Sequence, residues 1–100
     1  MKKVKIFDAT LVREEGAFSF KEKIEITRQL ERLNVDVIEI PEIENEKTDI
    51  LFVKTAASFV KDSILSVAAG KTLKSIENAA LALSSAKKAR IRKSIYNLSI

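Results

Sequence analysis

The strongest constraint on the fold of this chain is a regular alternation of strand-like and helix-like segments. Strands are expected near residues 3–8, 35–40, 63–67 and 90–96, and helices near residues 20–33, 49–60 and 72–86. Successive strands begin roughly 30 residues apart, which is the size of one βα unit. The pattern predicts an α/β fold in one domain over residues 1–100, a parallel βαβαβαβ unit with right-handed crossovers.

Individual residues mark where the expected helices begin and end. Ser19 and Glu22 have the spacing of a capping box before the first helix, and Asn34 stands where a left-handed residue would end it. Thr72 is a candidate N-cap for the third helix, and Pro41 closes the second strand. These local signals support the same division into strands and helices.

Two architectures share this alternation of strands and helices. One is an open doubly wound sheet, and the other is a segment of a TIM (β/α)8 barrel. A complete barrel takes about 250 residues, so a chain of 100 residues corresponds to half of one. In both architectures ligands gather at the carboxyl ends of the strands, which are residues 8–15, 39–42 and 68–71.

The composition excludes several classes of site. The chain contains no histidine and no cysteine, which rules out Ser-His-Asp and Cys-His catalysis and histidine-rich or cysteine-rich metal sites. No apolar run reaches about 18 residues and no secretory signal is present, so we expect a cytoplasmic protein without a membrane partner. The net charge is +4, but the basic residues near the end lack interleaved aromatic residues, so nucleic acid is not an expected partner.

A charged cluster follows the first expected strand. Asp8, Arg13, Glu14 and Glu15 place one guanidinium and three carboxylates in one loop. Hard divalent cations prefer carboxylate oxygens, and arginine pairs bidentately with carboxylates. The cluster therefore suits a divalent metal with an anionic substrate, and its alternative interpretation is a solvated charged loop.

The run from Val4 to Leu11, VKIFDATL, resembles the strand-one signature of the isopropylmalate, homocitrate and citramalate synthases, Asp-Thr-Thr-Leu-Arg-(Asp/Glu)-Gly-Glu-Gln. The likeness continues through residues 18–26 and 29–39, and more diffusely to about residue 92. The resemblance implies the N-terminal half of a TIM barrel from an acyltransferase that condenses acyl-CoA with a 2-oxo acid and uses a divalent metal ion. It also implies the missing C-terminal half-barrel as a partner. The exposed edges of the first and fourth expected strands instead allow further copies to pair in a homo-oligomer.

The resemblance also implies roles for particular residues. Without a gap, Val12 and Arg13 stand at the arginine and carboxylate positions of the family motif; with one inserted residue, Arg13 and Glu14 do. We favour the gapped alignment because it keeps both charges in order. Arg13 would then be catalytic and polarise the substrate carbonyl, Glu14 and Asp8 would be metal ligands, and Glu39 would contact the substrate.

Other positions depart from the family pattern. The family completes its metal site with a His-x-His pair from a late strand, and it carries His-x-Phe after the position of Ile91, where this chain has Arg92, Lys93 and Ser94. We therefore expect a fragment or remnant of a synthase-like enzyme that is inactive by itself. The alternatives are a self-associating half-barrel with a structural role and a small anion-binding module.

Overall fold

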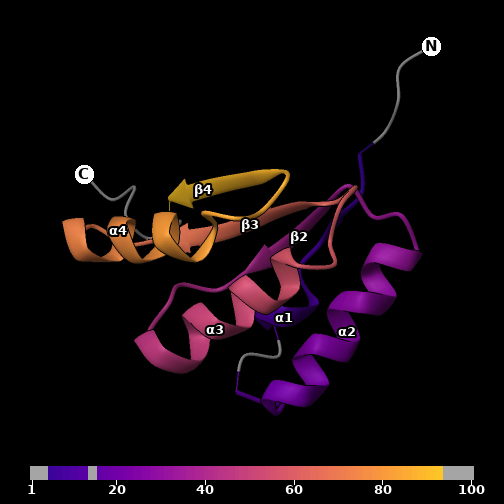
Figure 1. The fold of residues 1–100 in the computed structure, drawn as a ribbon, viewed down its shortest axis with the longest axis horizontal. Helices are drawn as coiled ribbons and strands as arrows, with labels where there is room; N and C mark the ends of the chain where they lie inside the picture. Colours follow the sequence, from indigo (N-terminus) through magenta and orange to yellow (C-terminus); the bar gives the residue numbers. More distant parts are fainter. Residues whose placement is uncertain (1–4, 14–15, 94–100) are drawn as a thin grey trace.

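The computed structural model describes residues 5–13 and 16–93, and it contains a parallel sheet with helices between its strands (Figure 1). The strands are β1 (Phe7–Asp8), β2 (Val37–Ile40), β3 (Ile64–Ala69) and β4 (Ala89–Lys93). The helices are α1 (Thr10–Arg13), α2 (Phe20–Arg32), α3 (Glu46–Ala57) and α4 (Leu73–Ala82). No helix within these described residues is long and apolar enough to cross a membrane.

The strands are all parallel and lie side by side in chain order, β1-β2-β3-β4. When strands that follow one another in the chain are also neighbours in the sheet, right-handed crossovers place every connecting helix on the same side of the sheet. In a doubly wound sheet, by contrast, the strand order reverses and helices cover both faces. Figure 1 shows α2 and α3 below the sheet, and α4 packs into the same core as α3. The structure confirms the expected βαβαβαβ unit and distinguishes the half-barrel from the doubly wound alternative.

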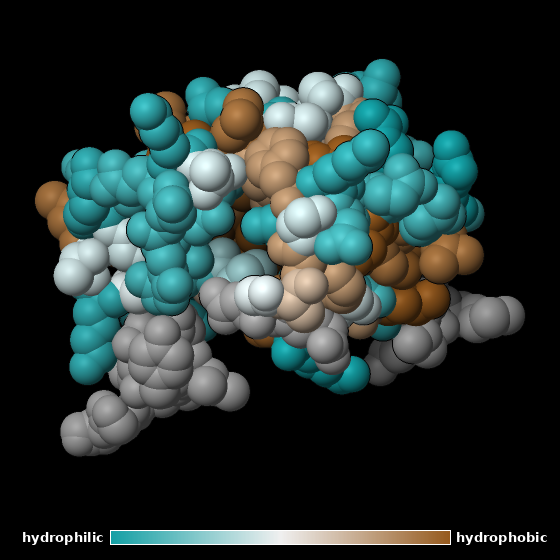
Figure 2. All heavy atoms as spheres, turned by 90° about the horizontal axis from the view of Figure 1, so that it is seen from below, coloured by the Kyte–Doolittle hydropathy of each residue, from teal (hydrophilic) through white to brown (hydrophobic). Residues whose placement is uncertain are grey.

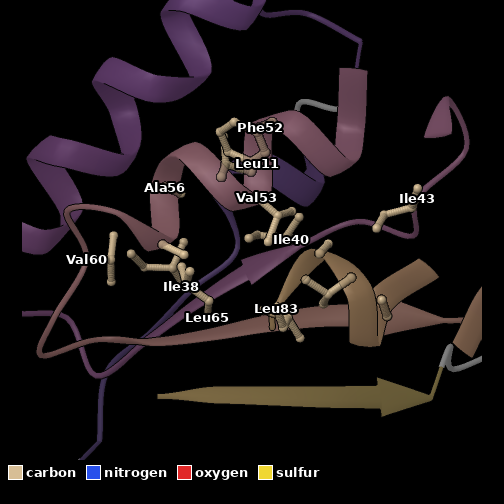
Figure 3. Close-up of a cluster of buried hydrophobic side chains, with 14 of the residues drawn as sticks. Leu11, Ile38, Ile40, Ile43, Phe52, Val53, Ala56, Val60, Leu65 and Leu83 are labelled. Atoms are coloured by element: carbon tan, nitrogen blue, oxygen red, sulfur yellow. The ribbon is translucent and has the colours of Figure 1, made fainter. Parts of the chain in front are cut away.

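The hydrophobic core lies between the sheet and the helices (Figure 3). Ile38 of β2 and Leu65 of β3 point toward α3, which contributes Phe52 and Val53. Leu11 reaches the same core from α1 and so anchors this one-turn helix beside the end of β1. Full burial of one such side chain stabilises the fold by about 1.5–3 kcal/mol. The core therefore holds the strands against the helices.

Alternate residues of the strands point away from the helices. We call this side of the sheet the inner face, because it would line the interior of a closed barrel. By alternation and register the inner face comprises Phe7, Val37, Glu39, Ile64, Ser66, Ala68, Arg90 and Arg92.

The helix ends follow the local signals of the sequence. Ser19 and Glu22 form the expected capping box: the Glu22 amide donates to Ser19 Oγ at 3.2 Å and the Ser19 amide donates to Glu22 Oε1 at 2.8 Å. Thr72 is the N-cap of α4, with its Oγ1 3.1 Å from the Ser75 amide nitrogen. Asn34 has a φ of 61°, the left-handed conformation expected after α2. These predictions are confirmed.

Other boundaries differ from the expected ones. Helix α3 begins at Glu46, earlier than the expected start near residue 49, because Asn45 Oδ1 caps it by accepting the Thr48 amide at 3.2 Å. The short helix α1 was not expected at all. Of the expected first and fourth strands, residues 3–4 and 94–96 lie outside the described part of the chain.

Hydrophobic side chains also reach the outer surface. Seen from below Figure 1, hydrophobic areas lie between hydrophilic side chains (Figure 2). Leu33, which follows α2, and Leu73, which begins α4, are each 70% exposed. Single exposed leucines are common on folded proteins and indicate no partner by themselves.

The carboxylate of Glu31 ties α2 to the segment that enters β3. It accepts the backbone amides of Lys61, Asp62 and Ser63 at 2.9, 3.1 and 3.2 Å. Burial raises the pKa of Glu31, but these hydrogen bonds to the charged form outweigh burial, so the pKa lies below its ordinary value. The ionised side chain thus holds the start of β3 against α2.

We predict that Glu31→Gln lowers the free energy of unfolding by about 1–2 kcal/mol, since an amide oxygen is a weaker acceptor for three N–H groups than a carboxylate. Urea unfolding followed by circular dichroism measures the change. The matched control is Glu25→Gln on the exposed side of α2, where the carboxylate accepts from Gln29 Nε2 at 3.0 Å. This control should change the stability by less than about 0.5 kcal/mol. Equal losses in the two variants would contradict the role of Glu31.

The lowered pKa of Glu31 also predicts a pH dependence. A carboxyl group with a folded pKa below its unfolded pKa contributes stability above the unfolded value and loses it as the pH falls through the folded value. The native chain should therefore lose stability more steeply than Glu31→Gln when the pH falls below the ordinary glutamate value of 4.5. Unfolding curves at pH 7, 5, 4 and 3 measure this difference, and parallel pH profiles would show that Glu31 is not responsible.

Candidate functional site at the carboxyl ends of the strands

The predicted residues after β1 do not form one cluster in the described part of the chain. Asp8 is half-buried, and its Oδ1 accepts the Thr10 amide at 2.9 Å, which begins α1. Its register with Ile38 places Asp8 on the helix side of the sheet. Arg13 is exposed at the last residue of α1 and forms no ion pair with a described residue. Glu14 lies outside the described residues.

Glu39 lies apart from Asp8, on the inner face of β2. It is half-buried, and its register partner on β3 is Ser66. Within residues 5–13 and 16–93, no three carboxylates gather in a way that could hold a metal ion. Because the Asp8 carboxylate is also engaged by Thr10, the described side chains do not by themselves fit the divalent-metal site that the resemblance implies.

One polar side chain near the strand ends with several hydrogen bonds is Arg92, which the sequence did not single out as a site residue. From β4 its guanidinium crosses the inner face and donates to the carbonyl oxygen of Ser66 on β3 and, at 3.2 Å, to Ser66 Oγ. It also donates to the carbonyl oxygen of Ile40 at the end of β2, at 2.9 Å. One side chain therefore joins three neighbouring strands.

The surroundings of Arg92 set its electrostatic properties. Burial lowers the pKa of Arg92, the negative charge of Glu39 raises it, and the positive charge of Arg90 lowers it, with a net effect below its ordinary value. Arginine nevertheless stays charged in proteins. The inner face thus carries a fixed positive charge beside Glu39.

A second arginine crosses the inner face from β4. The Arg90 guanidinium lies over the ring of Phe7 on β1, 5.5 Å from the ring centroid, which is a cation–π distance. Arg90 and Arg92 are two residues apart on one strand, so their side chains share a face. The two-residue spacing of Arg90 and Arg92 in the sequence therefore indicates that both side chains lie on the inner face. It does not indicate which groups on β2 and β3 accept hydrogen bonds from Arg92.

A hydrogen-bond network joins the ends of β2 and β3 near the predicted regions 39–42 and 68–71. Ser75 Oγ of α4 accepts the Gly70 amide at 2.7 Å and donates to Glu42 Oε2 at 2.9 Å. A Cβ atom on Gly70 would lie 2.6 Å from Glu42 Oε2. Gly70 therefore allows the Glu42 carboxylate to approach the backbone after β3.

Two cavities open at this end of the sheet. The smaller, about 260 Å³, lies between the β1 and β2 loops and is lined by residues that include Leu11, Lys23, Pro41 and Phe52. The larger, about 690 Å³, lies at the ends of β3 and β4. Its lining residues are Ala69, Gly70, Lys71, Ile76, Ile91, Arg92 and Lys93. Its lining includes three basic residues, although the guanidinium of Arg92 extends across the inner face to Ser66 and Ile40.

We predict that Gly70→Ala lowers the free energy of unfolding by about 1 kcal/mol, because the new methyl group displaces the Glu42 carboxylate from Ser75. In a Glu42→Ala background Gly70→Ala should lower the free energy of unfolding by less, because the obstructing carboxylate is gone. Urea unfolding of the two single variants and the double variant gives the coupling energy, expected at about 0.5 kcal/mol or more. Strict additivity would show that the methyl group and Glu42 do not meet.

The fold and the strand ends together define the class of this protein. Consecutive parallel strands, helices on one side and polar side chains at the carboxyl ends are the features of a (β/α)8-barrel protein, of which this chain forms half. No family model matches the chain, and no solved structure matches it significantly.

Curated proteins nevertheless show a clear relationship. The 2-isopropylmalate synthase of Halalkalibacterium halodurans is 40% identical over 95 residues, which is 91% of this chain and 18% of that protein. The enzymes of Polynucleobacter asymbioticus and Pyrococcus abyssi are 45% and 39% identical over 93 and 95 residues, which is 89% and 91% of this chain. The chain is similar to 2-isopropylmalate synthases over about nine-tenths of its own length, and it spans about a fifth of the length of these relatives.

Proposed function

We propose that this chain supplies the N-terminal half of the barrel of an acyl-CoA condensing enzyme and that it needs the other half of the barrel for activity. The observation that carries the proposal is the identity of about 40% over nine-tenths of the chain to proteins named 2-isopropylmalate synthase. The consecutive parallel strands support it, since β1 and β4 each have one edge without a described neighbouring strand. Those edges are where further barrel strands would pair.

In the proposed reaction the enolate of an acyl-CoA attacks the keto carbon of a 2-oxo acid, and hydrolysis of the thioester then releases CoA. Arg13 would stabilise the negative charge that develops on the former keto oxygen, as a fixed cation at that position lowers the barrier. Its exposed place at the end of α1 leaves the side chain accessible to a ligand. Glu39 on the inner face would contact the 2-oxo acid.

The proposal can be tested with a chimera. The matched segment of the Halalkalibacterium halodurans relative is replaced by this chain, and CoA release from acetyl-CoA is measured with a panel of 2-oxo acids. We expect release by the chimera and none by the 100-residue chain alone. Arg13→Ala in the chimera should lower kcat by about 10²–10³-fold, the usual cost of removing one group that stabilises an oxyanion.

The control is Arg32→Ala in the same chimera, which removes an exposed arginine at the end of α2. It should leave kcat within about twofold of the parent, because a surface charge far from the reaction contributes little. A folded chimera with no CoA release for any acceptor would refute the proposed function. Activity that is unchanged by Arg13→Ala would refute the role of Arg13.

A further inference from the structure

The two outer strands of the sheet, β1 and β4, carry exposed apolar side chains that the central strands lack. Ile6, just before β1, is 53% exposed, Phe7 of β1 is 49% exposed, and Ile91 of β4 is 40% exposed. Every residue of β2 and β3 is buried or half-buried. Single exposed apolar side chains are common on folded proteins, but these lie at both ends of one sheet, where a further strand would cover them.

The backbone of both outer strands also presents hydrogen-bonding groups to the open side. The carbonyl oxygen of Lys88 accepts a β3 amide at 3.0 Å, so by alternation the backbone groups of Ile91 point to the open edge of β4. The carbonyl oxygen of Ile6 accepts a β2 amide at 3.0 Å, so the backbone groups of Phe7 point to the open edge of β1. No described strand lies beyond either edge, so each can accept one more parallel strand.

Two copies of this half-barrel can satisfy both edges at once. A half-turn about an axis parallel to the strands brings β4 of each copy beside β1 of the other, keeps all strands parallel and leaves the helices outside. The four described strands of each copy then give the eight strands of a closed barrel, which has no edge. This arrangement stops at two copies, whereas an arrangement that does not close would add copies without limit.

The register of the described strands indicates which residues would meet. The paired residues run from Asp8 on β1 to Ala89 on β4, which places residue 10 level with Ile91. An eight-stranded barrel of this type has a shear of eight residues, so each copy contributes about four. A shift of about four residues toward the N-terminus sets Ile6 of the second copy beside Ile91, whereas the opposite shift would carry its β1 beyond the start of β4.

The two open edges match in that register. Ile6 and Ile91 both lie on the helix side of the sheet by alternation, so their side chains would form an apolar cross-strand pair. The Phe7 amide of the second copy points away from its own β2 and would donate to the Ile91 carbonyl oxygen. Both the side chains and the backbone groups of the two edges therefore complement each other.

We propose that this chain pairs with a second copy, that β4 of each copy lies against β1 of the other, and that the pair closes an eight-stranded sheet. Charge opposes this association in part, because each chain has a net charge of +4 and both copies place Arg90 and Arg92 on the enclosed inner face. Salt should therefore tighten the pair.

The pairing does not rest on the proposed condensation. It concerns this chain by itself, whereas in the chimera the added half of the barrel would occupy both edges. Loss of pairing would leave the proposed function untouched, and an inactive chimera would leave the pairing untouched.

Sedimentation velocity of the full chain tests whether the pair forms. We expect a reversible equilibrium between monomer and dimer whose dimer fraction rises over about 5–500 µM, with no larger species. The dimer should tighten by about twofold or more when sodium chloride is raised from about 50 to about 300 mM. A strict monomer over the whole concentration range, or an open series of larger oligomers, would overturn the proposal.

Disulfide cross-linking tests the register, since the chain has no cysteine of its own. Ile6→Cys and Ile91→Cys are mixed in equal amounts and oxidised, because neighbouring strands bring their Cα atoms within disulfide range. The mixed dimer should form at least about fivefold faster than the cross-linked dimer of either variant alone. Faster cross-linking of Ile91→Cys with itself would show that β4 pairs with β4, which contradicts the closed arrangement.

The matched control for Ile91→Cys is Leu51→Cys, which lies on the exposed surface of α3, away from both edges, and is 55% exposed in the native chain. Mixed with Ile6→Cys, it should form the mixed dimer no faster than either variant cross-links with itself. Equal rates for the two mixtures would indicate random collision and overturn the predicted contact.

A backbone variant tests the open edge of β4. Ile91→Pro removes the amide that points to this edge and leaves the hydrogen bonds between β4 and β3 in place. Ile91→Ala is the matched control, because it shortens the same side chain and keeps the amide. Ile91→Pro should weaken the dimer about fivefold more than Ile91→Ala, and equal losses would show that no strand pairs there. The cysteine mixture keeps the proposal testable should Ile91→Pro fail to fold.

Discussion

The arrangement of this chain depends on one constraint, the right-handed crossover between neighbouring parallel strands. Because β1 to β4 are paired in chain order, every crossover has to place its helix on the same side. That side acquires the hydrophobic core, in which Ile38 and Leu65 pack against α3. No described helix covers the opposite side, so the side chains of the strands alone determine the polarity of that surface. The composition of the inner face is thus a consequence of topology as much as of sequence.

Much of this fold could be predicted because its signals are local. Ser19, Asn34 and Thr72 act on backbone groups within one helical turn, so sequence spacing is sufficient to identify them. The site depends on groups that are distant in sequence. The acceptors of Arg92 come from two other strands and are fixed by register, and the approach of Glu42 to Gly70 depends on how two loops meet. No sequence pattern predicts that Arg92 reaches these acceptors or that Glu42 approaches Gly70.

The similarity to 2-isopropylmalate synthases suggests roles for residues at the carboxyl ends of the strands, but the contacts of these residues in this chain differ from those roles. Asp8 begins a helical turn and lies on the opposite side of the sheet from Glu39. Arg92 stands where the family resemblance places a histidine, and its charge is used to join strands. An arginine cannot serve as a proton acceptor near neutral pH or as a metal ligand, so Arg92 cannot supply the chemistry that the resemblance expects from a histidine.

The contact between Arg90 and Phe7 has a consequence for how the chain folds. It joins the last described strand to the first, and it can form only after the intervening helices and strands have brought the two ends of the sheet together. Contacts between residues so far apart in sequence raise the contact order and slow folding, because loop entropy is lost before the contact is gained. The α2–β2 and α3–β3 segments can assemble earlier through nearer neighbours. We therefore expect the contact between Arg90 and Phe7 to form late in folding.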